Sequence, residues 1–143
     1  MTAPGRRSAP GSRAAGLLLA AAVVVILAAC TPGSGLAGRV WQLAATTTKV
    51  PASQDAVADP QAYTIEFRSD GSFSARADCN QVGGTYTTSG SSLTIDLSST
   101  LAFCGEASLA DVYVTGLGNA ASYALADGEL TITTTDEATM TFK

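Results

Sequence analysis

The sequence of 143 residues contains no histidine, and charged residues make up only 14% of it. The absence of histidine excludes Ser-His-Asp and Cys-His catalysis, zinc bound by histidine and haem with a histidine ligand. No Walker motif, dinucleotide fingerprint, EF-hand loop or glycosylation sequon is present. The length fits one domain and is too short for two of ordinary size.

Basic residues are few, and they are unevenly distributed. Three of the eight, Arg6, Arg7 and Arg13, lie before residue 30, where there is no acidic residue. The rest of the chain has five basic and twelve acidic residues, which gives it a net charge of −7. Because an acidic domain of this kind is repelled by phosphate backbones, we expect no nucleic-acid partner.

The amino-terminal segment has the pattern of a bacterial export signal. The basic residues are followed by an unbroken apolar run from Ala14 to Ala29, and these are the n-region and h-region of a signal peptide. The run ends in Leu-Ala-Ala-Cys at residues 27–30, which resembles a lipobox. The resemblance implies a signal peptide at residues 1–29, cleavage before Cys30, and a lipid carrying fatty-acyl chains such as palmitate on this cysteine. An uncleaved transmembrane anchor and ordinary secretion are the alternatives.

The three cysteines fit this interpretation. If lipid occupies Cys30, then Cys79 and Cys104 remain as an even pair in an oxidising compartment, and we expect a disulfide. It would close a loop of about 26 residues and stabilise the fold by about 3–4 kcal/mol in the chain-entropy model. Two free thiols or a metal site with two cysteines are the alternatives. Without histidine a metal would need carboxylates, so we expect no metal and no cofactor.

Residues 30–37 have the small-residue composition of a flexible tether, and one domain is predicted at residues 38–143. Period-2 alternation dominates the domain and indicates about eight strands. In the first strand, Trp41, Leu43 and Ala45 share the inward face. Residues 46–61 lack periodicity and contain two prolines, so we expect a long loop with a short helical turn there.

Two Asp-Gly turns can be tested against the alternation, because cross-strand partners point to the same face. A three-residue loop at residues 69–71 pairs Phe67 with Phe73, and it requires Gly71 in the left-handed conformation. A two-residue turn at residues 127–128 pairs Leu125 with Leu130. Further inward positions are Leu93, Ile95, Leu97, Met140 and Phe142, and a break in the strands is expected at Gly83-Gly84.

One segment, from Ser108 to Leu117, has helical spacing instead. Its apolar residues form one helix face, at Leu109, Val112, Tyr113, Gly116 and Leu117. Ser108 and Asp111 resemble a capping box. The predicted fold class is therefore α+β, mostly β: a curved antiparallel sheet or partly closed barrel of about eight strands. One helix, between the fifth and sixth strands, packs on it and covers its open side.

Several landmarks coincide along the domain. They are an L-x-G-x-x-W-x-L pattern at residues 36–43, the hairpin at residues 67–73, Asp78-Cys79-Asn80 before Gly83-Gly84-Thr85-Tyr86, Leu93-Thr94-Ile95, and the stretch 100–104. In this order and spacing they resemble the META domain, or HslJ-like, family of small bacterial exported proteins and lipoproteins, over residues 36–143. Two departures exist, because the family usually has Gly where this chain has Asp78, and Met near Leu101-Ala102-Phe103. The resemblance implies a loose association with stress responses, antibiotic tolerance and secretion, and it carries over no catalytic residue.

The candidate sites favour structural roles. Cys79-Asn80 beside the glycine pair is either a binding loop or, as we expect, a disulfide-pinned turn in which Asn80 bonds its own backbone. A lone Trp41 on an inward strand face indicates core rather than ligand stacking. Five carboxylates are expected to be solvated charges rather than an acid–base pair: Glu66, Asp70, Asp78, Glu106 and Asp111. Serine catalysis would need a lysine, and after residue 30 there are only Lys49 and Lys143.

We therefore expect no enzyme but a non-catalytic lipoprotein of the cell envelope. It would be a monomer, anchored by lipid on Cys30 to the extracytoplasmic side of a membrane, with a stress-related binding or envelope-support role and an envelope protein as partner. The alternative is an inhibitor of an extracytoplasmic hydrolase, acting through residues 46–61, or a carrier of a small apolar ligand within the sheet.

Overall fold

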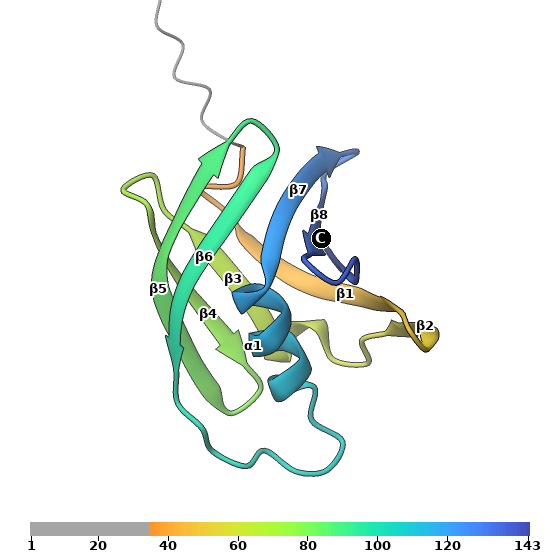
Figure 1. Cartoon of the computed structure of the whole chain (residues 1–143). Coiled ribbons are helices and arrows are strands. Elements are labelled where there is room, and N and C mark those ends of the chain that lie inside the picture. The colour runs from red at the N-terminus through yellow and green to blue at the C-terminus, as the bar shows by residue number, and fades with distance from the viewer. Residues whose placement is uncertain (1–34) are drawn as a thin grey trace, which may run out of the picture.

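The computed structural model describes residues 35–143 (Figure 1). The predicted signal peptide and Cys30 lie outside the described residues. The elements, in chain order, are β1 (Val40–Lys49), β2 (Ala52–Ala56), the 3₁₀ helix η1 (Pro60–Ala62), β3 (Tyr63–Phe67), β4 (Ser72–Ala77), β5 (Asn80–Ser89), β6 (Ser92–Ser99), α1 (Ala110–Gly118), β7 (Ala120–Ala126), β8 (Glu129–Thr134) and β9 (Thr139–Phe142).

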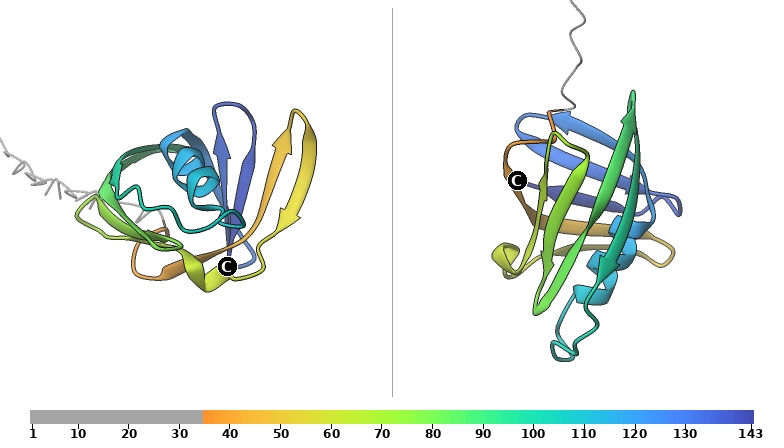
Figure 2. Two further views of the ribbon diagram at one scale, coloured as in Figure 1. Left: turned by 90° about the horizontal axis from the view of Figure 1, so that it is seen from below. Right: turned by 90° about the vertical axis from the view of Figure 1, so that its left-hand side faces the viewer.

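Eight of these strands form a closed antiparallel barrel. The strand order is β1-β3-β4-β5-β6-β7-β8-β9, and pairing of β1 with β9 closes the ring. The joint between β6 and β7 has a single pair, Ser92 with Ser122. The helix α1 lies against β6 on this side (Figure 2). The predicted α+β, mostly β fold with a helix over the open side of the sheet is confirmed, with one extra strand, β2.

Large side chains fill the interior of the barrel. Those that are fully buried include Trp41, Phe67, Tyr113 and Phe142, together with several leucines and isoleucines. The indole Nε1 of Trp41 donates to the carbonyl of Leu36 at 2.9 Å, so its polar atom is satisfied as burial requires. The predictions of a core role for Trp41 and of inward positions for Met140 and Phe142 are confirmed.

Ordered packing begins slightly before the predicted domain start at residue 38. Leu36 is fully buried, and Ala37 forms a bridge with Phe67 of β3. Within β1 a bulge between Leu43 and Ala45 shifts the alternation, so that Thr46 is buried in place of Ala45. A bulge adds one residue to a strand and therefore exchanges its two faces beyond that point.

Both predicted Asp-Gly turns have the expected register. Phe67 pairs with Phe73 across a three-residue loop, and Gly71 has φ +84°. Leu125 pairs with Leu130, while Asp127 and Gly128 have φ values of +52° and +81°. Two successive positive φ angles are those of a type I′ turn, which suits the twist of a two-residue hairpin.

Residues 46–61 are not a long loop, and this prediction was wrong. The strand β1 continues to Lys49, turns at Val50-Pro51 and pairs with β2, before the predicted helical turn forms at η1. All five residues of β2 are exposed. Because alternation reports burial on one face, a strand that is solvated on both faces leaves no such pattern.

The predicted break at Gly83-Gly84 was also wrong, because β5 runs through both glycines. A Cβ built at Gly84 would lie 2.0 Å from the backbone oxygen of Asp96 in β6. The glycine is therefore needed where two strands approach closely, and not where a strand ends.

The helix α1 lies between the sixth and seventh strands, not between the fifth and sixth, because β2 adds one. Tyr113 and Leu117 are buried as predicted, but Val112 is 51% exposed. The predicted capping box does not form: the N-cap residue is Leu109, and no cap bond from its side chain exists. Instead the Ser108 hydroxyl accepts a hydrogen bond from the Ala110 amide at 3.2 Å.

Replacing Tyr113 with phenylalanine is expected to raise the free energy of unfolding by about 1 kcal/mol. The Tyr113 hydroxyl is fully buried, and within residues 35–143 it has no hydrogen-bond partner. Burial also raises the pKa of Tyr113, so the hydroxyl stays neutral. Removing an unsatisfied buried polar group removes its desolvation cost. Urea unfolding followed by circular dichroism measures the difference.

The matched control for this variant is Tyr63→Phe. The Tyr63 hydroxyl accepts a hydrogen bond from the Leu109 amide at 2.8 Å, so its loss is expected to cost about 1 kcal/mol. If Tyr113→Phe destabilises the protein as much as Tyr63→Phe, then a water molecule bonds the Tyr113 hydroxyl in solution, and the expectation is wrong.

Candidate functional site

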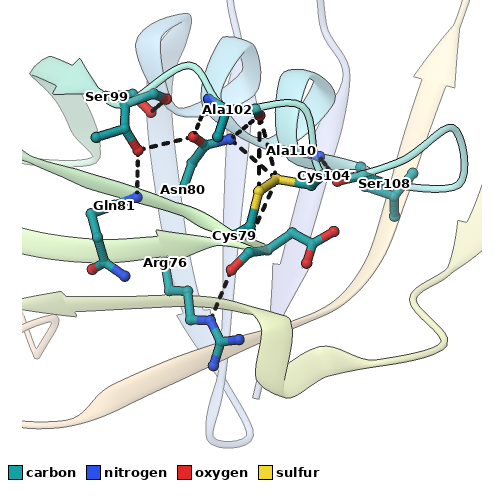
Figure 3. Close-up of a disulfide and its surroundings, with 12 residues drawn as sticks. Arg76, Cys79, Asn80, Gln81, Ser99, Ala102, Cys104, Ser108 and Ala110 are labelled. Atoms are coloured by element: carbon teal, nitrogen blue, oxygen red, sulfur yellow. Dashed lines mark hydrogen bonds between the residues drawn. A yellow bond between two sulfur atoms is a disulfide. The ribbon is translucent and has the colours of Figure 1, made fainter.

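A disulfide joins the turn between β4 and β5 to the segment that connects β6 with α1. Cys79 and Cys104 are bonded, with their Cα atoms 5.6 Å apart (Figure 3). This confirms the predicted disulfide over two free thiols or a metal site with two cysteines. Residues 100–109, which follow β6 and precede α1, are called the pinned loop below.

The turn that carries Cys79 has a strained backbone residue. Asp78, which stands where the resembled family usually has glycine, has φ +58°. Its amide donates to the Ala62 carbonyl at 2.7 Å, and its own carbonyl accepts from Nε of Arg76 at 2.9 Å. These bonds hold an aspartate in the left-handed conformation, which aspartate tolerates better than most residues.

Asn80, the buried first residue of β5, holds the pinned loop through its side chain. Its side-chain Nδ2 donates to the Ala102 carbonyl at 3.0 Å and to Sγ of Cys104 at 3.3 Å. Its Oδ1 accepts from the Ala102 amide at 2.8 Å and from the Thr100 hydroxyl at 2.9 Å. The prediction that Asn80 bonds its own local backbone was therefore wrong, because its partners lie about twenty residues along the chain (Figure 3).

The pinned loop presents two large apolar side chains to solvent. Leu101 is 90% exposed and Phe103 is 83% exposed. They alternate with Thr100, Ala102 and Cys104, which are the three residues that Asn80 contacts. Residues 100–103 are all exposed and are not part of a strand, so Asn80 holds the loop through Thr100, the Ala102 backbone and Cys104 while the two apolar side chains contact solvent.

Carboxylates border the pinned loop. Glu106 and Asp111 line a hollow of about 330 Å³ together with Leu101, Phe103 and Cys104. Asp59 and Asp78 line a neighbouring hollow with Ala107 and Leu109. Of the predicted solvated carboxylates, the fold brings Asp78, Glu106 and Asp111 near the disulfide. Glu66 and Asp70 lie instead at the β3–β4 hairpin.

The carboxyl groups with perturbed pKa values lie elsewhere. Hydrogen bonds from Ser72 lower the pKa of Asp70, and the Thr134 hydroxyl lowers the pKa of Asp136. Lys49 lowers the pKa of Glu137 through a hydrogen bond and its charge. All three shifts favour the ionised form, whereas a general acid at neutral pH needs a raised pKa.

Metal binding and membrane crossing each need a particular arrangement of side chains. Within residues 35–143, no group of three or more Cys, Asp or Glu side chains is placed to hold a metal ion. No helix in this part of the chain is long and apolar enough to cross a membrane.

Sequence reasoning missed the exposure of Leu101 and Phe103. Their spacing of two residues is the same as that of buried strand positions such as Leu93 and Ile95. The one signal available was their place directly before Cys104, in a stretch that also lacks the polar residues of a usual loop.

A family model described as META domain matches residues 34–143. Solved structures of other proteins resemble the fold. A protein from Burkholderia xenovorans, solved by NMR, has a TM-score of 0.62 at 19% identity, over 77% of this chain and 83% of the other. A crystal structure of a DUF4847 family protein from Bacteroides vulgatus has a TM-score of 0.56 at 15% identity, over 75% of this chain and 92% of the other. No curated protein matches the chain.

Proposed function

The chain belongs to the META domain family, and on this premise we propose that it is a non-catalytic lipoprotein of the cell envelope. Lipid on Cys30 would anchor it to the extracytoplasmic side of a membrane. Its barrel would have a stress-related role in binding an envelope protein or supporting the envelope.

The observation that carries this proposal is the Cys79–Cys104 disulfide. Structural disulfides form and persist in oxidising compartments outside the cytoplasm. The pair leaves Cys30 as the third cysteine, directly after an apolar run with basic residues before it. A lipidated cysteine at this place accounts for all three.

The absence of catalysis is supported by the roles of the polar residues around the disulfide. Asn80 is occupied in holding the pinned loop. The Ser108 hydroxyl accepts a hydrogen bond from the Ala110 amide at the start of α1. A nucleophile needs an adjacent base, and the sequence provides no histidine for that role.

The intact mass of the protein, extracted from its native membrane, tests the anchor. We expect a mature chain that begins at Cys30 and carries diacylglyceryl and fatty-acyl groups. Reduction is expected to add two hydrogens, from the Cys79–Cys104 bridge alone. A Cys30→Ser variant is the control and is expected to keep the mass of the uncleaved precursor.

Either of two results would contradict the proposal. An unprocessed mass for the unchanged protein would mean a transmembrane anchor, and a mature mass without lipid would mean ordinary secretion. In both cases the lipoprotein assignment fails, while the fold and the disulfide are unaffected.

One observation favours a second function, the inhibition of an extracytoplasmic hydrolase. The pinned loop is held at both ends and presents Phe103 outward, as a loop that enters a cleft must do. The pinned loop would then take the role expected of residues 46–61, which form the β1–β2 hairpin. The carrier alternative loses support, since large side chains such as Trp41 and Phe142 occupy the barrel interior. If the partner of the loop is a hydrolase, the turnover rate of that hydrolase is measured with and without this protein. A fall in the rate on binding means inhibition, and an unchanged rate means attachment alone.

A further inference from the structure

We propose that Leu101 and Phe103 of the pinned loop insert into an apolar pocket with a basic rim on a second, extracytoplasmic protein. This inference deepens the proposed function and rests on it, because it names the binding surface and the chemistry of the partner.

The exposure of this pair is unusual for a chain with a well-filled core. Single exposed apolar residues are normal on protein surfaces. Here a leucine and a phenylalanine, two residues apart, are 90% and 83% exposed on one segment. Aromatic residues are enriched in the buried centre of protein interfaces. Exposed apolar surface that is bordered by polar residues marks interaction sites.

The pinned loop is ordered before any partner arrives. Both backbone groups of Ala102, the residue between Leu101 and Phe103, are bonded to Asn80. The disulfide at Cys104 follows, and the amide of Leu109 donates to the Tyr63 hydroxyl at 2.8 Å. A loop that is already fixed loses little conformational entropy on binding, so its apolar contacts translate more fully into affinity.

The charge around the pinned loop favours some binding partners over others. Four carboxylates border it, those of Asp59, Asp78, Glu106 and Asp111. Arg76, which lies beside this turn, directs its Nε to the carbonyl of Asp78. A partner with lysine and arginine around its pocket would complement this rim. A second copy of the same loop would meet like charges, and an anionic lipid surface would repel it.

The position of the loop also argues against a lipid occupant. Strand β3 runs from Tyr63, beside the pinned loop, to Phe67, which bonds Gly38 near the start of the described chain. The two sites therefore lie at opposite ends of the barrel, as Figure 1 and the right-hand view of Figure 2 show. Cys30 precedes Gly35 by five residues, which span at most about 18 Å. If Cys30 carries lipid, this tether keeps the Gly35 end of the barrel within about 18 Å of the membrane, and the pinned loop lies at the other end.

The test places a photoreactive amino acid at position 103 of the full-length chain, in its native membranes. A second chain carries the same group at position 50, because Val50 is 93% exposed and lies on the β1–β2 turn. We expect an adduct with another protein from position 103 and not from position 50. Sequencing of the crosslinked peptide is expected to map it to an apolar pocket bordered by lysine or arginine.

Variants then measure the contribution of each feature with the purified partner. Leu101→Ser and Phe103→Ser are each expected to weaken binding about tenfold or more. Val50→Ser, at an equally exposed site, is expected to leave affinity unchanged. The double variant Glu106→Gln with Asp111→Asn is expected to slow association and to reduce its dependence on salt. The melting temperatures of the serine variants should match that of the unchanged protein, because these side chains contact solvent.

Four outcomes would overturn the inference: an adduct with phospholipid, an adduct with a second copy of the chain, no adduct, or an adduct that Leu101→Ser leaves intact. These results are separate from the mass measurement on Cys30. Lipid on Cys30 without a loop-dependent adduct means that the inference alone fails. A loop-dependent protein adduct from a chain without lipid means that the proposed anchor alone fails.

Discussion

Gly84→Ala is expected to lower the free energy of unfolding by about 3 kcal/mol or more, which is a large fraction of the stability of a domain of this size. The new Cβ would lie 2.0 Å from the backbone oxygen of Asp96 and 3.0 Å from Cα of Leu97. Both atoms belong to β6, which pairs with β5 from Val82 to Ser89. Because no side chain can rotate to relieve the contact, the two strands must separate. Thermal and urea unfolding followed by circular dichroism measure the loss.

The neighbouring glycine provides the matched control. A Cβ built at Gly83 would lie 3.7 Å from the Phe73 carbonyl oxygen, which is an ordinary contact distance. Gly83→Ala is therefore expected to change stability by less than about 1 kcal/mol, and it has the entropic advantage of alanine over glycine in a strand. Equal losses for the two variants would mean that strand approach is not the reason for the glycine at position 84.

This contrast shows which parts of the fold can be predicted from sequence. The hairpin between Phe67 and Phe73 was predictable, because its register depends on the local alternation of faces. The role of Gly84 was not, because the constraint comes from Asp96 on another strand. The strand β2 was missed for a different reason. Its residues are exposed on both faces, so they have no hydrophobic period to detect.

In the candidate site, too, some features could be predicted from the sequence and others could not. The Cys79–Cys104 pair followed from counting cysteines in a chain that was expected to be exported. The partners of Asn80 could not be predicted, because Ala102 becomes its neighbour only when β5 and β6 pair. Nor could the exposure of Leu101 and Phe103, since it depends on how the loop after β6 is held against Asn80 and Cys79.

Asn80→Ala is expected to lower the free energy of unfolding by about 2–4 kcal/mol, since it removes several hydrogen bonds from a site that water hardly reaches. Asn80 is 4% exposed, and both backbone groups of Ala102 depend on its side chain. The disulfide at Cys104 remains, so the loop stays attached at that end while residues 100–103 become free to move. Limited proteolysis, with the disulfide intact, is expected to cut there first.

The control for this variant is Gln81→Ala, because the next side chain along β5 is exposed and its removal is expected to change stability by less than about 0.5 kcal/mol. If Asn80→Ala lowers the free energy of unfolding by no more than Gln81→Ala does, then Asn80 does not hold the pinned loop.

The Asn80→Ala variant also separates the effect of loop rigidity from the effect of apolar contact in the proposed docking. It leaves Leu101 and Phe103 unchanged, so a fall in affinity for the partner would come from the entropy of ordering the loop on binding. If affinity is unchanged while proteolysis at residues 100–103 increases, the two apolar side chains bind without prior ordering, and the argument from rigidity is wrong.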